Sequence, residues 1–113
     1  MAFLIVDDNQ AMRHAIGRVV GDLTDRIIEC ADGAGALLAY QANLPEWVLM
    51  DIEMKDVDGI TATRQIMAAY PRARIIIVTE YDDDDMRRAA AEAGASRYVV
   101  KEDLISILEI LTG

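Results

Sequence analysis

The chain has 113 residues, of which 53% are hydrophobic, and a formal net charge of −9 at pH 7. This length supports one packed core but not two, so we expect residues 1–113 to form a single domain. The negative charge argues against nucleic acid binding by this chain, because a protein that neutralises phosphates needs a basic face. The apolar runs are much shorter than the roughly 20 residues needed to cross a bilayer. No charged and apolar leader opens the chain, and Cys30 is its only cysteine, so we expect a cytoplasmic location without membrane contact or an internal disulfide.

Five short apolar runs predict five strands, because each is too short for a helix and is bounded by polar or turn-forming residues. They cover residues 3–6, 26–31, 46–50, 75–78 and 97–100. Four of them end in a polar side chain: Asp7 and Asp8 follow the first run, Asp51 the third, Thr79 the fourth and Lys101 the fifth.

Five helices are expected between and after these strands. Apolar residues recur at helical spacing over residues 12–23, 33–42, 59–70 and 82–93, and a last helix should start at Glu102 or Asp103 and run nearly to the end. Pro71 and Gly94 stand where proline and glycine end helices. Strands that alternate with helices predict a doubly wound α/β fold, (βα)5, with a parallel sheet between two helical layers and the flavodoxin-like strand order 2-1-3-4-5.

The polar strand ends should gather at one edge of this sheet, where ligands bind in such folds. Asp7, Asp8 and Asp51 repel one another there, and a hard divalent cation with oxygen ligands is the simplest way to keep all three ionised. Mg²⁺ suits a few carboxylates that leave room for waters and a phosphate oxygen. With the hydroxyl of Thr79 and the ammonium of Lys101, the group matches what a phosphoryl group in transfer requires, and one carboxylate can be the acceptor.

Some of these residues also have plainer interpretations. Asp7 and Asp8 could cap the first helix, since aspartate is a favoured N-cap. The acids at positions 82–85 are best explained as the first turn of a helix, where they favour its dipole. His14 is expected on a solvated face, and buried packing is expected for Cys30. In the last helix, apolar residues point in too many directions for one stripe, which leaves open a partner or dimer face or simply a helix end.

The motifs in order resemble the receiver domains of two-component response regulators over essentially the whole chain. The matching residues are Asp7-Asp8 after the first strand, Asp51 in Met50-Asp51-Ile52-Glu53-Met54, Asp58-Gly59, Thr79, Gly94-Ala95, Tyr98 and Lys101. The segment Tyr98-Val99-Val100-Lys101-Glu102-Asp103 resembles the subfamily whose receivers precede a helix-turn-helix DNA-binding domain. We therefore expect transcription regulation through an output domain that lies outside this chain.

The resemblance implies a role for each matching residue. Asp51 would accept a phosphoryl group from a sensor histidine kinase or phosphotransfer protein. Asp8, Asp51 and the backbone carbonyl of Glu53 would bind Mg²⁺, and Asp7 would hold a metal-bound water. Lys101 would pair with the phosphoryl oxygens.

The resemblance also implies a switch. Thr79 would move to hydrogen-bond the phosphate, and Tyr98 would move inward behind it. The changed surface of the fourth helix, fifth strand and fifth helix would relay the state, and a homodimer through that face is an open expectation. Such a domain is not an enzyme acting on a separate substrate, but a phosphoacceptor that catalyses its own phosphotransfer and dephosphorylation.

Several residues depart from the family pattern. Lys55 and Glu102 stand where the family commonly has proline, and Glu80 is larger and more acidic than the usual small residue, so it could hinder a phosphodonor. Glu53 and Tyr81 occupy positions that resemble the family's tuners of phosphate lifetime, and we expect Tyr81 to shield the phosphate.

One other function remains open from the sequence, and a second is disfavoured by the length of the chain. A phosphorylation-independent, receiver-like interaction module would keep the fold without the chemistry, and Glu80 is its best support. A Mg²⁺-dependent phosphohydrolase would need a substrate pocket and a cap for which the chain has no length.

Overall fold

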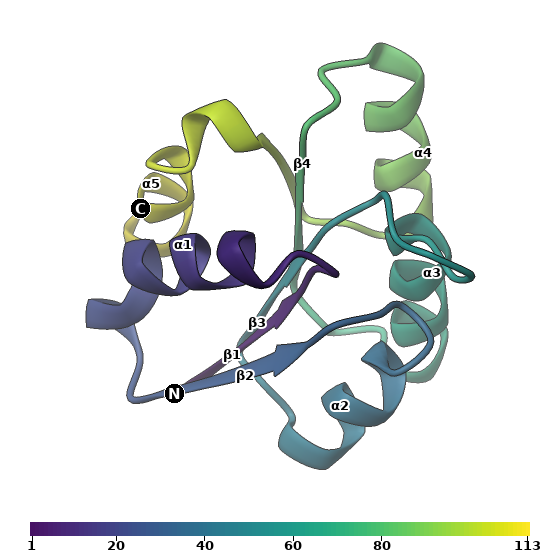
Figure 1. The fold of residues 1–113 in the computed structure, drawn as a ribbon. Coiled ribbons are helices and arrows are strands. Elements are labelled where there is room, and N and C mark those ends of the chain that lie inside the picture. Colours follow the sequence, from purple (N-terminus) through teal and green to yellow (C-terminus); the bar gives the residue numbers. More distant parts are fainter.

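The computed structural model describes residues 1–113 and contains one parallel five-stranded sheet of order β2-β1-β3-β4-β5 (Figure 1). The strands are β1 Ala2–Val6, β2 Arg26–Cys30, β3 Trp47–Met50, β4 Ile75–Thr79 and β5 Arg97–Val100. The helices are α1 Gln10–Val20, α2 Ala36–Asn43, α3 Gly59–Ala69, α4 Asp84–Ala93 and α5 Ser106–Thr112. Short 3₁₀ turns at Gly21–Leu23 and Lys101–Asp103 complete the chain. The predicted fold class and strand order are confirmed.

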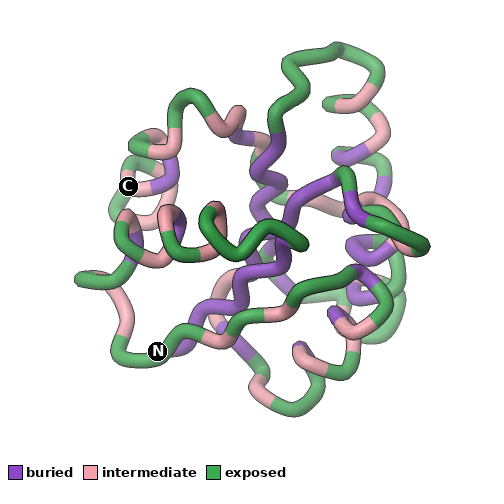
Figure 2. Tube along the Cα trace, in the orientation of Figure 1, coloured by how far each residue is buried: buried purple, intermediate pink, exposed green.

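Two apolar cores lie on opposite faces of the sheet, because successive side chains of a strand point to opposite sides. On β1, Leu4 and Val6 pack in the core beneath α2, α3 and α4, whereas Phe3 and Ile5 pack beneath α1 and α5. The inner strands β1, β3 and β4 are buried almost throughout, and the edge strands β2 and β5 are partly exposed (Figure 2).

The strand register places the first and third loops side by side. Val6 pairs with Met50 across β1 and β3, so the residues that follow, Asp7 and Asp51, leave the sheet next to each other. The backbone N–H of Asp51 donates to the carbonyl of Val6 at 2.9 Å, which extends the ladder by one residue into the loop. The chain adds β2 on one side of β1 and β3 on the other, so the switch point of the sheet lies between β1 and β3. Open α/β sheets bind ligands at such a point.

Three predicted helix starts are wrong by a few residues. The second helix begins at Ala36 rather than at Gly33, because a turn precedes it in which the N–H of Gly35 donates to Asp32 Oδ1 at 2.7 Å. The fourth helix begins at Asp84, because Asp83 is its N-cap and its side chain accepts hydrogen bonds from the N–H groups of Asp85 and Met86. The last helix does not start at Glu102 or Asp103. Lys101–Asp103 form a 3₁₀ turn. The bonds from Ile107 N to Leu104 O and from Leu108 N to Ile105 O keep this tighter spacing into the first turn of α5.

The expectation of an apolar surface on the last helix holds for one residue at its start. Ile105 is 61% exposed, while Ile107 is fully buried and the other apolar residues of this segment are half-buried. His14 is exposed, as predicted. Cys30 is only half-buried rather than buried, and its thiol donates to the carbonyl of Asp32 at 3.1 Å. No helix is both long and apolar enough to span a membrane.

Candidate functional site

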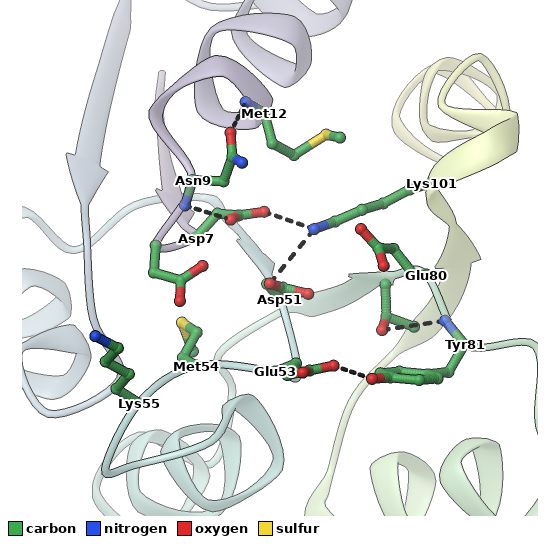
Figure 3. Close-up of a pocket in the computed structure, with 12 residues that line it drawn as sticks. Asp7, Asn9, Met12, Asp51, Glu53, Met54, Lys55, Glu80, Tyr81 and Lys101 are labelled. Carbon is green, nitrogen blue, oxygen red and sulfur yellow. Dashed lines mark hydrogen bonds and ion pairs between the residues drawn. The ribbon is translucent and has the colours of Figure 1, made fainter.

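A pocket of about 480 Å³ opens at the carboxyl edge of the sheet. Most of the residues that line it are polar and lie at or after the ends of β1, β3, β4 and β5, and one comes from α1 (Figure 3). They are Asp7, Asp8, Asn9, Met12, Asp51, Glu53, Met54, Lys55, Thr79, Glu80, Tyr81 and Lys101. The structure therefore brings together every predicted site residue except Tyr98, which contacts this group from β5 through Tyr81.

Asp51 lies at the centre of the pocket, with 5% of its surface exposed. Its Oδ1 accepts a hydrogen bond from the N–H of Ile52 at 2.9 Å, which fixes the carboxylate close to its own backbone. The following loop folds back tightly, since the N–H of Gly59 donates to the carbonyl of Ile52 at 2.8 Å. A Cβ at Gly59 would lie 1.7 Å from the carbonyl oxygen of Asp51, so only glycine allows α3 to begin this near the site.

Lys101 bridges two of the carboxylates from the end of β5. Its Nζ lies 3.0 Å from Asp7 Oδ2 and 3.4 Å from Asp51 Oδ2, and all three side chains are nearly buried. Burial opposes the charge of Lys101, but its contacts with Asp7 and Asp51 outweigh that effect and raise its pKa. The ammonium therefore stays charged where a phosphoryl oxygen next to Asp51 would lie within its reach.

The electrostatics of Asp51 are unfavourable to its charged form. Burial, followed by repulsion from Asp7, raises the pKa of Asp51 to about 6, and the attraction of Lys101 offsets this only in part. Such a carboxylate gains from any further positive charge, because a nearby cation stabilises the ionised form.

The residues present fit a divalent cation. Asp7, Asp8 and Asp51 each offer a carboxylate oxygen, and these oxygens lie within 4.8 Å of one another. Asp7 Oδ2 is buried without a hydrogen-bond donor in good geometry and faces only the Lys101 ammonium. Three carboxylates and one ammonium leave two negative charges, which one divalent ion balances. All of these ligands are oxygens, and the site is open to solvent on the side of the exposed Asp8. Such a site suits Mg²⁺, because this ion keeps several of its water ligands when it binds to a protein.

The loop after β4 forms another wall of the pocket. Thr79 is fully buried, and its hydroxyl oxygen is 3.4 Å from the N–H of Tyr81. The hydroxyl of Tyr81 donates to the carboxylate of Glu53, joining the loops after β3 and β4 (Figure 3). The hydroxyl of Tyr98 in turn donates to the carbonyl of Tyr81 at 2.6 Å.

The two departures nearest the site are exposed and lie on its rim. Glu80 and Lys55 both line the pocket. Asp56, which follows Lys55, has a positive φ of 65°, a left-handed conformation that aspartate tolerates better than most residues. The loop therefore depends on Asp56 for its turn.

Sequence reasoning missed two residues that build this site. Asn9 caps α1 by accepting from the N–H of Met12 at 2.9 Å, so neither Asp7 nor Asp8 serves as the cap. Arg13 donates to the carbonyl of Asp7 at 2.7 Å and to Glu29 at 2.8 Å, tying the first loop to β2. The cap could have been predicted from the position of Asn9 just before the helical pattern. The role of Arg13 could not, because its only distinguishing feature in the sequence is that it lies one helical turn after Asn9.

Fold and site together define a class of protein, a (βα)5 domain with an acid cluster and a lysine at the switch point of the sheet. The family model for the response regulator receiver domain matches residues 3–112. The chain belongs to this family, the receiver domains of two-component signalling.

Its curated relatives include regulators of transcription and of chemotaxis. The transcriptional regulatory protein DegU of Brevibacillus brevis is 30% identical over 101 residues, which cover 88% of this chain and 43% of that protein. The chemotaxis protein CheY of Bacillus subtilis is 37% identical over 99 residues, which cover 87% of this chain and 82% of CheY. The chain thus spans about half the length of the transcriptional regulator.

Solved structures agree with this assignment. A two-component response regulator of the LuxR family from an Aurantimonas strain has a TM-score of 0.87 and 33% identity, with 99% of this chain and 85% of that chain covered. The CheX–CheY–BeF3–Mg complex from Borrelia burgdorferi has a TM-score of 0.89 and 27% identity, with 96% of this chain and 84% of that chain covered. The predicted resemblance to the receivers of transcriptional regulators is confirmed by DegU and by the LuxR-family regulator.

Proposed function

We propose that Asp51 is the phosphoacceptor of this receiver domain and that the chain itself catalyses the transfer. The observation that carries the proposal is the geometry of Asp51, a buried carboxylate 3.4 Å from the Lys101 ammonium and clustered with Asp7 and Asp8. In the transfer, an oxygen of Asp51 bonds to phosphorus while the N–P bond of a phosphohistidine breaks. The imidazole nitrogen leaves with the electron pair and takes up a proton.

The proposed metal site consists of Asp8, Asp51 and the backbone carbonyl of Glu53, with Asp7 holding a metal-bound water. Mg²⁺ bound there supplies positive charge to the phosphoryl oxygens. Lys101 stabilises the same oxygens from the opposite side, because its ammonium is held by Asp7 and Asp51. A cation held beside both carboxylates would relieve the repulsion between Asp51 and Asp7 and lower the pKa of Asp51, which favours its ionised, nucleophilic form.

Thr79 and Tyr98 are the proposed switch. The Thr79 hydroxyl has only a 3.4 Å contact with the N–H of Tyr81 to give up, so it is free to turn toward a phosphate on Asp51. Tyr98 is linked to the same segment by its bond to the Tyr81 carbonyl, and movement of Thr79 would displace both. The surface of α4, β5 and α5 would then report the state to a partner.

The physiological partner that follows is a sensor histidine kinase or a phosphotransfer protein in the cytoplasm. A DNA-binding output domain is proposed for the protein to which this domain belongs. Homodimerisation through α4, β5 and α5 is part of the same proposal. A phosphorylation-independent interaction module is not favoured, since the acid cluster and its lysine are complete.

Intact mass spectrometry after incubation with acetyl phosphate tests the proposal. We expect one phosphoryl group to be added, only when Mg²⁺ is present, and none in Asp51→Asn. Asp56→Asn is the matched control, because Asp56 is an exposed acid in the adjacent loop. A folded protein that gains no phosphoryl group from acetyl phosphate or a phosphohistidine donor would contradict the proposal.

A further inference from the structure

A chain of contacts leads from the site pocket to the outer face of α4. It starts at Glu53, passes through the side chain of Tyr81 to its backbone carbonyl, continues through the hydroxyl of Tyr98, and reaches Arg87. These residues come from the loops after β3 and β4, from β5 and from α4. Arg87 is the only member for which neither the sequence pattern nor the family resemblance suggests a role.

Arg87 covers the ring of Tyr98. Its guanidinium carbon lies 4.5 Å from the ring centroid, within the range of a cation–π contact. Asp82 holds the guanidinium in that place, since its Oδ1 accepts from Arg87 Nη2 at 2.9 Å and from Nε at 3.1 Å. The cation–π contact therefore acts on the Tyr98 ring, and the ion pair with Asp82 holds the guanidinium that makes it.

The position of the Tyr98 ring fixes that of Tyr81. The Tyr98 hydroxyl can reach the Tyr81 carbonyl at 2.6 Å only while its ring stays where Arg87 covers it. Tyr81 and Glu53 in turn form the partition between the acidic pocket and a neighbouring pocket of about 450 Å³ lined by Ile52, Ile60 and Met86. Loss of the hydrogen bond from Tyr98 to the Tyr81 carbonyl would allow Tyr81 to move out of its place between the two pockets.

We propose that Arg87 is a positioning residue for the phosphorylation switch: by holding the Tyr98 ring it keeps Tyr81 in the wall of the Asp51 pocket, and so lengthens the lifetime of the phosphate. The proposal rests on phosphoryl transfer to Asp51. Because exposed cation–π and ion-pair contacts are each weak, the expected effect on hydrolysis is about threefold rather than a complete loss.

The direct test is fluorine NMR of protein labelled with 3-fluorotyrosine at its four tyrosines. Single Tyr→Phe variants assign the resonances, and Tyr40 and Tyr70, whose rings pack 4.9 Å apart elsewhere, are internal references. Arg87→Ala should shift the Tyr98 and Tyr81 resonances only. Arg87→Lys, which keeps a cation, should return them toward the wild-type positions. Arg88→Ala is the matched control, because Arg88 pairs only with Asp85 at 3.4 Å, and it should shift neither.

The second readout is the rate at which phosphorylated protein loses its phosphoryl group, which should rise about threefold in Arg87→Ala and stay unchanged in Arg88→Ala. An unmoved Tyr98 resonance in Arg87→Ala, or a shift at Tyr98 without one at Tyr81, would overturn the proposal. So would altered resonances with an unaltered rate of hydrolysis. If the wild-type protein gained no phosphoryl group, the proposed function would fail, and the resonances alone would decide the positioning role of Arg87.

Discussion

At the scale of single residues, the buried charge of Asp51 lowers the stability of the folded protein while it provides the nucleophile. The pKa of about 6 for a carboxyl whose ordinary value is 3.8 means that the folded protein holds this proton more tightly than the unfolded chain does. The contribution of Asp51 to the stability of the metal-free protein therefore falls as pH rises from about 4 to about 6, and it stays constant above that range.

Asp51→Asn removes the buried charge and should stabilise the metal-free protein at pH 7. The shift of roughly two units corresponds to about 2 to 3 kcal/mol, and this advantage should shrink as pH falls toward 4. Urea denaturation of both proteins at several pH values measures it, with the exposed Asp56→Asn as control. Parallel stability curves for the wild type and Asp51→Asn across this range would show that Asp51 carries no such cost.

Tyr81 tests the shielding of the phosphate at the same scale. We expect Tyr81→Ala to speed hydrolysis of phosphorylated Asp51 by about threefold or more, since water then enters beside Glu53. Tyr81→Phe keeps the ring but loses the bond to Glu53, and should fall between the two. The decay of phosphorylated protein, followed by intact mass, gives the three rates. An unchanged rate in Tyr81→Ala means that Tyr81 does not shield the phosphate.

At the scale of elements, the strand ends were predictable and the side-chain links between loops were not. Asp7, Asp51, Thr79 and Lys101 could be placed together because parallel strands bring their carboxyl ends to one edge. The Glu53–Tyr81 bond joins residues 28 positions apart, and it depends on how two loops are turned, which no local pattern encodes.

The first residues of the helices were also difficult to predict from the sequence. Four acids in a row at positions 82–85 offer several equivalent caps, and only the backbone shows that Asp83 is the one used. After β5, the apolar residues follow no single spacing, so the sequence pattern did not distinguish the 3₁₀ turn at Lys101–Asp103 from the start of an α-helix.

The capping of α4 gives a prediction about that element. Asp83→Ala should lower the free energy of unfolding by about 1 kcal/mol, because two N–H groups lose their acceptor. Asp84→Ala, which removes only an acid from the first turn, should cost about half as much or less. Thermal or urea unfolding of the two variants compares them directly. Equal costs would mean that Asp83 does not act as the cap.

At the scale of the whole molecule, metal binding should add to stability. Two negative charges left uncompensated in the pocket make Mg²⁺ binding favourable to the folded state only. At a concentration 100 times its dissociation constant, Mg²⁺ should stabilise the fold by about 2.7 kcal/mol. Asp8→Asn, at an exposed position, should fold normally and lose most of this gain, whereas Asp84→Asn should keep it. Full stabilisation of Asp8→Asn by Mg²⁺ would remove Asp8 from the metal site.

The proposed switch depends on which side chain carries the phosphoryl group. Borohydride reduces an acyl phosphate to an alcohol, so treatment of phosphorylated protein followed by peptide mass spectrometry identifies the residue that carried the phosphate. We expect the side chain at position 51 alone to be converted to that of homoserine. Conversion at Asp7, Asp8 or another acid, with position 51 intact, would contradict this expectation.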